Sequence, residues 1–247
     1  MKKRKLFIDA LRGFALVNMI LYHGLYDIVY IFHQNINWYQ GKPGYLWQQS
    51  IAMTFIIVSG FTRHLSKKPV KDGITIFLWG FLLTLITTIF MPDQKILFGI
   101  LSFLGLAILI SWLFEKYLNR IEPIAGLFLS RFLFISTKEI QRGSLFFDKI
   151  HLPQEIYEIP GLFVLGFPDI HFSSTDYFPV FPWIFLFTAG YYLGKMYKKK
   201  KITLPNIPKK EDILTLIGQN SLKVYLLHQP ILYLLLTGIF TVLKNYR

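Results

Sequence analysis

The chain contains no cysteine, which excludes disulfide bonds and metal sites built on thiolates. Charge is also scarce, because only 17% of the 247 residues are Asp, Glu, Lys or Arg, against roughly 25% in soluble domains. Hydrophobic residues make up 53%, and they fall in blocks of about 16–27 residues, the length that crosses a bilayer. The composition therefore predicts a single integral membrane domain over residues 1–247.

Seven apolar segments predict an all-α fold, a polytopic membrane bundle of about seven transmembrane helices. Their ranges are 6–32, 44–65, 73–91, 95–114, 121–136, 179–196 and 222–243. The connection 137–178 is too long and too aromatic for a plain solvated loop, so we expect it to fold back on the outer face. Its GLFVLGF stretch is too short to span and predicts a re-entrant or interfacial segment. An aromatic belt at the lipid headgroups is the alternative.

The net charge of +13 arises from short clusters of Lys and Arg between the apolar blocks. This distribution argues against nucleic acid as a partner, since the clusters do not line one helix. Positively charged loops stay in the cytoplasm. With the N-terminus inside, the inner segments hold seventeen Lys and Arg and the outer segments seven. The bias predicts a multi-pass protein of the bacterial cytoplasmic membrane with a cytoplasmic N-terminus.

The first span carries ionisable side chains at a depth where they mark functional sites by default. Arg12 and His23 are eleven positions apart, so they share one helical face, about 20° apart around the axis and roughly 16 Å along it. Asp9 and Asp27 flank the same stripe. These residues also interrupt the run after MKKRK, which favours a mature helix over a signal peptide. The structural alternative is an Asp9–Arg12 pair near the headgroups, with His23 bonded to a neighbouring carbonyl.

A neutral imidazole in a partly dry site is a competent general base, and a carboxylate at i+4 fixes its tautomer. His23 and Asp27 are therefore candidate catalytic residues. Such a base would deprotonate an acceptor hydroxyl or amine directly, without a Ser or Cys nucleophile. The sequence has no HExxH, P-loop, GxSxG or EF-hand spacing, so metal, nucleotide-hydrolysis and serine-hydrolase functions lack support.

Polar groups also gather in later spans. Ser59 and Arg63 are i,i+4 neighbours at the cytoplasmic end of the second span, and Gly60 lets a ligand or another backbone come close. Arg63 equally fits a positive-inside anchor. Tyr225 and His228 share a face of the last span, where His228 fits a satisfied structural histidine or a catalytic one.

At the outer end of the sixth span, Asp176 and Tyr177 precede two prolines and Trp183. This interfacial pattern suits aromatics that face a sugar. A helix N-cap is the alternative for Asp176.

The chain resembles the membrane acyltransferases related to heparan-α-glucosaminide N-acetyltransferase and their bacterial relatives. The motifs that carry the resemblance are, in order, IDALRGFALVNMILYHGLYD, SGF at 59–61, STDYFPVFPW and NSLKVYLLHQP. Arg12 and His23 also match the Arg-x10-His pattern in the first helix of the wider superfamily of polysaccharide and peptidoglycan O-acyltransferases.

This resemblance implies a helix bundle through which an acyl group, acetyl above all, passes from cytoplasmic acetyl-CoA to a sugar or cell-envelope acceptor on the outer side, without a metal. His23 would be the catalytic histidine and Arg12 a partner of the donor. In the heparan enzyme the catalytic histidine lies just beyond the first span, where Gln34 stands here, so the adjacent His33 is a rival for the role. Further candidate donor contacts are Ser59 and Arg63. Candidate acceptor contacts are Asp176, Tyr177, Tyr225 and His228.

Two functions of other classes compete with acyl transfer. In a proton-coupled transporter, Asp9, His23 and Asp27 would form a proton relay. The lack of a visible internal repeat counts against it. A non-enzymatic membrane partner protein is the third alternative, and the sequence leaves the oligomeric state open.

Overall fold

The computed structural model describes residues 3–205, 207, 208 and 210–245, and about 73% of the structure is helical. Two compact units are distinguished, Met1–Phe55 together with Thr203–Arg247, and Ile56–Ile202. Each is described by itself below. Lys2, Lys209 and Arg247, which the charge bias counts, lie outside the described residues.

The first unit is built from helices of both chain ends. Its elements are α1 (Lys3–Tyr26), a π-helical turn η1 (Asp27–Ile31), α2 (Asn37–Gln40), the first two-thirds of α3 (Lys42–Thr62), α9 (Ile213–Gln219) and α10 (Ser221–Asn245). In η1 the N–H of Phe32 donates to the carbonyl of Asp27 at 2.9 Å, the i→i+5 bond of a π-helix. Such single turns within α-helices are frequent at functional sites.

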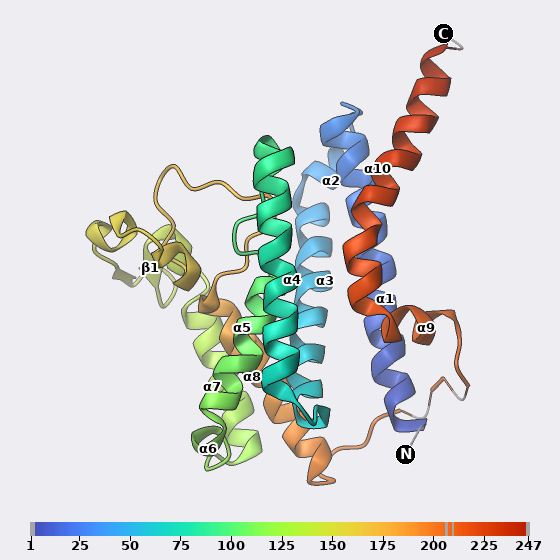
Figure 1. The fold of residues 1–247 in the computed structure, drawn as a ribbon. Coiled ribbons are helices and arrows are strands. Elements are labelled where there is room, and N and C mark those ends of the chain that lie inside the picture. The colour runs from blue at the N-terminus through green and yellow to red at the C-terminus, as the bar shows by residue number, and fades with distance from the viewer. Residues whose placement is uncertain (1–2, 206, 209, 246–247) are drawn as a thin grey trace. The chain divides into compact units, whose positions relative to one another are not determined.

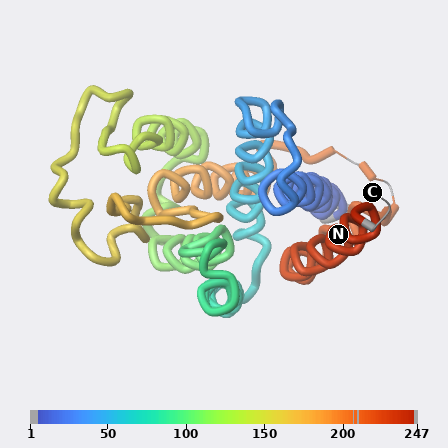
Figure 2. The backbone as a smooth tube through the Cα atoms, turned by 90° about the horizontal axis from the view of Figure 1, so that it is seen from above, coloured from blue at the N-terminus to red at the C-terminus, as the bar shows by residue number. Residues whose placement is uncertain are grey.

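Helix α1 packs against both α9 and α10, blue beside red in Figures 1 and 2. Two glycines allow the α1–α9 contact. A Cβ on Gly13 would lie 1.9 Å from the carbonyl oxygen of Leu214, and a Cβ on Gly218 would lie 1.8 Å from that of Asp9. The backbones of the two helices therefore touch, and neither position accommodates a side chain without separating them. Asp212 begins α9 through a capping box with Thr215.

The second unit contains the remaining helices and a small hairpin. Its elements are the end of α3, η2 (Arg63–Leu65), α4 (Pro69–Phe90), η3 (Pro92–Gln94), α5 (Ile100–Leu113), α6 (Glu115–Leu118), α7 (Pro123–Ser136), η4 (Ile140–Arg142), β1 (Ser144–Leu145), β2 (Ile150–His151), η5 (Gln154–Glu158), η6 (Leu162–Leu165) and α8 (Val180–Lys198). Helix α4 packs on α5, and α7 packs on α8 (Figure 1). The strands pair antiparallel, with Ser144 opposite His151.

Each of the seven apolar segments predicted as a span coincides with a helix, so the helical class is confirmed. Among the described residues, three helices are long and apolar enough to cross a bilayer, over Leu6–Ile31, Pro69–Phe90 and Ser221–Lys244. Helices α5 and α7 have 14 residues each, which at ~1.5 Å per residue falls short of the ~30 Å hydrocarbon core. The seven-span bundle and the single domain therefore stay predictions.

The helix predicted from residue 95 begins only at Ile100. The preceding backbone is engaged elsewhere, because the N–H of Leu97 donates to Ser174 Oγ at 2.9 Å and the carbonyl of Phe98 accepts from Phe178 N at 3.1 Å. These bonds hold the segment outside the helix, with φ +55° at Phe98, and attach the start of α5 to the residues before α8.

The connection 137–178, yellow to gold in Figure 2, folds into short turns fixed by tyrosines. The Tyr157 hydroxyl donates to the carbonyl of Ile140, and that of Tyr177 donates to the carbonyl of Phe163 at 2.5 Å. The GLFVLGF stretch forms only the four-residue turn η6, which ends at Gly166 with φ +117°, a conformation that favours glycine. Its re-entrant or interfacial placement stays a prediction.

Candidate functional site

The first unit brings two of the predicted histidines together. His23 on α1 and His228 on α10 lie with ring centroids 4.9 Å apart and ring planes at 65°. His23 is partly buried, whereas His228 is 8% exposed. The sequence placed these residues 205 positions apart, so their contact depends on the packing of α10 against α1.

The tautomer of His228 follows from one contact. Its Nδ1 lies 2.5 Å from the carbonyl oxygen of Tyr225. Because a carbonyl oxygen only accepts hydrogen bonds, Nδ1 carries the hydrogen and Nε2 carries a lone pair. Nε2 is buried and has no hydrogen-bond partner. Only one of the two ring nitrogens of His228 is therefore hydrogen-bonded, so His228 is not a fully satisfied structural histidine.

Asp27, at the start of η1, makes a hydrogen bond to α10. Its carboxylate is fully buried, and Oδ1 accepts from Nε2 of Gln229 at 2.7 Å. Oδ2 and the Gln229 amide oxygen are buried without a partner. The hydrogen bond that we expected between Asp27 and His23 is thus replaced by one to α10. The sequence alone did not identify Gln229, although an amide beside a histidine in an apolar helix was a visible signal.

Aromatic side chains of α2 and α3 hold α1 in place next to the histidines. The Tyr39 hydroxyl donates to the carbonyl of Tyr22 at 3.1 Å, and Trp47 Nε1 donates to Asn18 Oδ1 at 3.0 Å. Leu16 is completely buried in the same contact region. Helix α1, and His23 with it, is therefore held in place by polar contacts as well as by packing.

The other predicted residues of the first unit are arranged less favourably for chemistry. Arg12 pairs with Asp9 at 3.3 Å, the i,i+3 alternative that the sequence allowed, and its side chain is 22% exposed. His33 follows η1 with φ +54° and has an exposed side chain. Phe32 beside it stacks on Phe240 of α10 at 4.3 Å. The described contacts thus place His23, and not His33, beside a second histidine.

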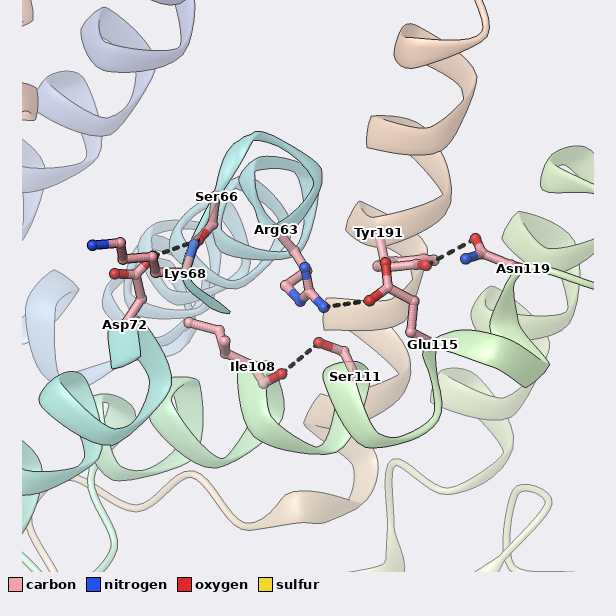
Figure 3. Close-up of polar contacts among 9 residues, drawn as sticks. All are labelled: Arg63, Ser66, Lys68, Asp72, Ile108, Ser111, Glu115, Asn119 and Tyr191. Carbon is pink, nitrogen blue, oxygen red and sulfur yellow. Dashed lines mark hydrogen bonds and ion pairs between the residues drawn. The ribbon is translucent and has the colours of Figure 1, made fainter. Parts of the chain in front are cut away.

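In the second unit, Arg63 is buried and donates from Nη2 to Glu115 Oε2 at 2.9 Å, while its Nε has no partner. Figure 3 shows this pair next to Tyr191, whose hydroxyl donates to Asn119 Oδ1 at 3.1 Å. The ring of His64 lies 4.1 Å from that of Tyr191. Sequence reasoning missed Glu115, because no local spacing connects it with Arg63, 52 positions away.

A buried lysine lies in the same unit. Lys195 is 5% exposed, and its ammonium donates to the carbonyls of Leu118, Asn119 and Ile121 at 3.1, 3.1 and 2.8 Å. All three of its hydrogens are used, and the charge lies at the carboxyl end of α6, where the helix dipole favours a cation.

The Thr62 hydroxyl donates a hydrogen bond to the backbone carbonyl of Ser59 at 3.1 Å. A Cβ on the following Gly60 would lie 2.0 Å from the carbonyl of Phe187, so the close neighbour that the sequence allowed there is the backbone of α8. Ser59 and Arg63 belong to the second unit, and Arg12 and the histidine pair to the first.

Asp176 and Tyr177 are fixed by the fold of the second unit. Asp176 Oδ2 accepts from the N–H of Ile100 at 3.0 Å, which caps α5 rather than the helix that follows Asp176 in the chain. Burial raises the pKa of Tyr177, and the nearby Tyr157 adds to the shift. Their role in acceptor binding stays a prediction. No group of His, Asp or Glu that could hold a metal ion occurs among the described residues.

The family model for heparan-alpha-glucosaminide N-acetyltransferase, catalytic, matches residues 4–230. No curated protein and no solved structure matches.

Proposed function

Because the chain belongs to the family of the heparan-α-glucosaminide N-acetyltransferase catalytic domain, we propose that it transfers an acyl group, acetyl in the first instance, from acyl-CoA to a sugar or other cell-envelope acceptor. The observation that carries the proposal is the His23–His228 pair beside the buried Asp27. Imidazole is the side chain best suited to accept a proton near neutral pH. Membership of this family favours acyl transfer over the proton-coupled transporter.

In the proposed reaction His23 is the general base. It takes the proton from the acceptor amine or hydroxyl while that nitrogen or oxygen forms a bond to the thioester carbonyl carbon. The carbon–sulfur bond then breaks, and the proton passes from His23 to the leaving thiolate, which departs as free coenzyme A. The step needs no acyl-enzyme intermediate, and His23 returns to its starting state.

We propose that Arg12 is the residue of the first unit that binds the acyl donor. It shares a helical face with His23, and its guanidinium, although paired with Asp9, remains partly exposed. A guanidinium presents a planar fork of donors to a phosphate, which an ammonium does not reproduce. Ser59 and Arg63 stay proposed donor contacts, supported by the unpartnered Nε of Arg63.

We further propose that the protein lies in the bacterial cytoplasmic membrane with its N-terminus inside, so that the acyl-CoA is taken from the cytoplasm and the acceptor is reached on the outer side. Apolar helices and the family both support a membrane protein. The charge bias of the connections supports the orientation.

The test uses the full-length protein in proteoliposomes, with radiolabelled acetyl-CoA and glucosamine as the probe acceptor. General-base help is typically worth about 10²–10⁴ in rate, so His23→Ala should lower transfer by that factor while acetyl-CoA still binds in calorimetry. His33→Ala is the matched control and should cost far less, because His33 is an exposed histidine that follows η1. A wild-type protein that binds acetyl-CoA but acylates no acceptor, or an inactive His33→Ala beside an active His23→Ala, would overturn the assignment.

A further inference from the structure

The His228 side chain carries a feature that packing alone does not explain. Tyr225 fixes its hydrogen on Nδ1, so Nε2 points its lone pair into a buried region without a donor. Buried polar atoms are normally hydrogen-bonded. If His228 only filled space, its unpaired Nε2 would cost folding free energy without any compensating function.

The groups around His228 narrow the choice of its partner. Tyr225 contributes the carbonyl already used, and its ring lies 5.5 Å away. Gln229 and Asp27 bond each other, and their remaining buried oxygens are acceptors, as Nε2 is. Acceptors cannot satisfy one another, so none of these atoms pairs with Nε2. The ring that packs against His228 and can present an N–H is the imidazole of His23, 4.9 Å away between centroids.

A general base also needs a partner for its second nitrogen. In a catalytic histidine, one nitrogen takes the proton and the other donates to a group that fixes the tautomer and orientation. The sequence assigned that role to Asp27, but Asp27 accepts from Gln229 instead. With ring centroids 4.9 Å apart, a turn of the His23 ring leaves room for a hydrogen bond of ~3 Å to Nε2, while His228 keeps its contact with the Tyr225 carbonyl. Catalytic hydrogen bonds often tighten only when substrate is bound.

We propose that His228 is the positioning residue for His23: its Nε2, set as an acceptor by the Tyr225 carbonyl, receives the N–H of His23 and keeps the opposite nitrogen of His23 free to take the acceptor's proton. The inference rests on the proposed acyl transfer and adds the partner of its base. The Asp27–Gln229 hydrogen bond supports the arrangement from the adjacent position, because Gln229 follows His228 on α10 and Asp27 lies one turn beyond His23. No covalent bond forms on His228.

The kinetic experiment compares three substitutions in the reconstituted full chain. His228→Phe removes the acceptor and should lower kcat by about 10²-fold or more, with the KM for acetyl-CoA unchanged. His228→Gln keeps an acceptor oxygen near the Nε2 position and should recover a large part of that loss. His171→Gln is the matched control, because His171 is an exposed histidine of the connection 137–178. The pH profile of kcat should shift in His228→Phe and not in the control, since loss of the hydrogen-bond acceptor changes the basicity of His23.

A second measurement does not depend on activity. In protein labelled with ¹⁵N-histidine, His228, assigned by its loss in His228→Gln, should show a protonated Nδ1 and an unprotonated Nε2, and the His23 resonances should move in His228→Phe. A protonated Nε2, or wild-type kcat and pH profile in His228→Phe, would overturn the proposal. If the wild-type protein acylates nothing, the proposed function fails, and the ¹⁵N spectra still decide whether His23 and His228 are bonded.

Discussion

Replacement of Gly13 by alanine should separate α1 from α9. The added Cβ would lie 1.9 Å from the carbonyl oxygen of Leu214, whereas ordinary contacts begin at 3.4 Å, so the helices must move apart by the difference of about 1.5 Å. Overpacking of this kind costs about 1–3 kcal/mol. The gain from a better helix former, about 0.5–1 kcal/mol, offsets part of it. We expect a net loss of up to about 2.5 kcal/mol in the free energy of unfolding.

The same substitution elsewhere in α1 provides the control. A Cβ on Gly24 meets only a methyl group of Leu232 at 3.7 Å, an ordinary contact. Gly24→Ala should therefore be neutral or slightly stabilising. The assay is reversible unfolding of the purified protein in mixed micelles of increasing SDS fraction, followed by circular dichroism. Equal unfolding midpoints for Gly13→Ala and Gly24→Ala would refute the close α1–α9 contact.

The reciprocal glycine sharpens the test. Gly218→Ala should destabilise by a similar amount, because its Cβ would lie 1.8 Å from the carbonyl of Asp9. Both substitutions separate the same two helices, so the double variant should lose less than the sum of the single losses. Full additivity would mean that the two glycines act at independent sites.

Two further predictions concern the connections. A membrane-impermeant thiol reagent applied to intact cells should label Lys149→Cys and not Lys200→Cys, since the bias in basic residues places them on opposite sides; the reverse pattern would invert the topology. Burial raises the pKa of Tyr157 and Tyr177 in the folded protein. Their contribution to stability is therefore fully present below the pKa of about 10 that tyrosine has in the unfolded chain. It is lost as the pH rises through the higher pKa of the folded state. Absorbance at alkaline pH should show both ionising above about 10, the ordinary tyrosine value, and Tyr157→Phe should remove one ionisation from that range.

Hydrophobic block length located the helices well, because a run of apolar residues in this chain has no other stable arrangement in lipid. The 3.6-residue period also placed Arg12 and His23 on one face of α1. Helix ends were less predictable where distant segments compete for the backbone. Leu97, for example, bonds Ser174, 77 positions away, and this contact delays the start of α5.

Partners of the site residues were predictable only when they were local. The Asp9–Arg12 pair follows from i,i+3 spacing, and the structure contains it. The partner of Asp27, by contrast, is Gln229, 202 positions later. Local spacing favoured His23 as that partner, because nothing in one sequence states which side of η1 faces α10. The same reason hid the contact between His23 and His228.

Lys195 shows that a basic residue counted for topology can have a second use. During insertion, a lysine on the inner side of the chain acts as a net charge that resists translocation. In the folded protein, the same ammonium is 5% exposed and enclosed by three carbonyl oxygens, so it has no hydrogen left for an anionic lipid headgroup. Under the proposed orientation, Lys195 would help to orient the chain during insertion and would afterwards attach α8 to the end of α6. The exposed lysines that follow it would then be the ones that attract acidic lipids.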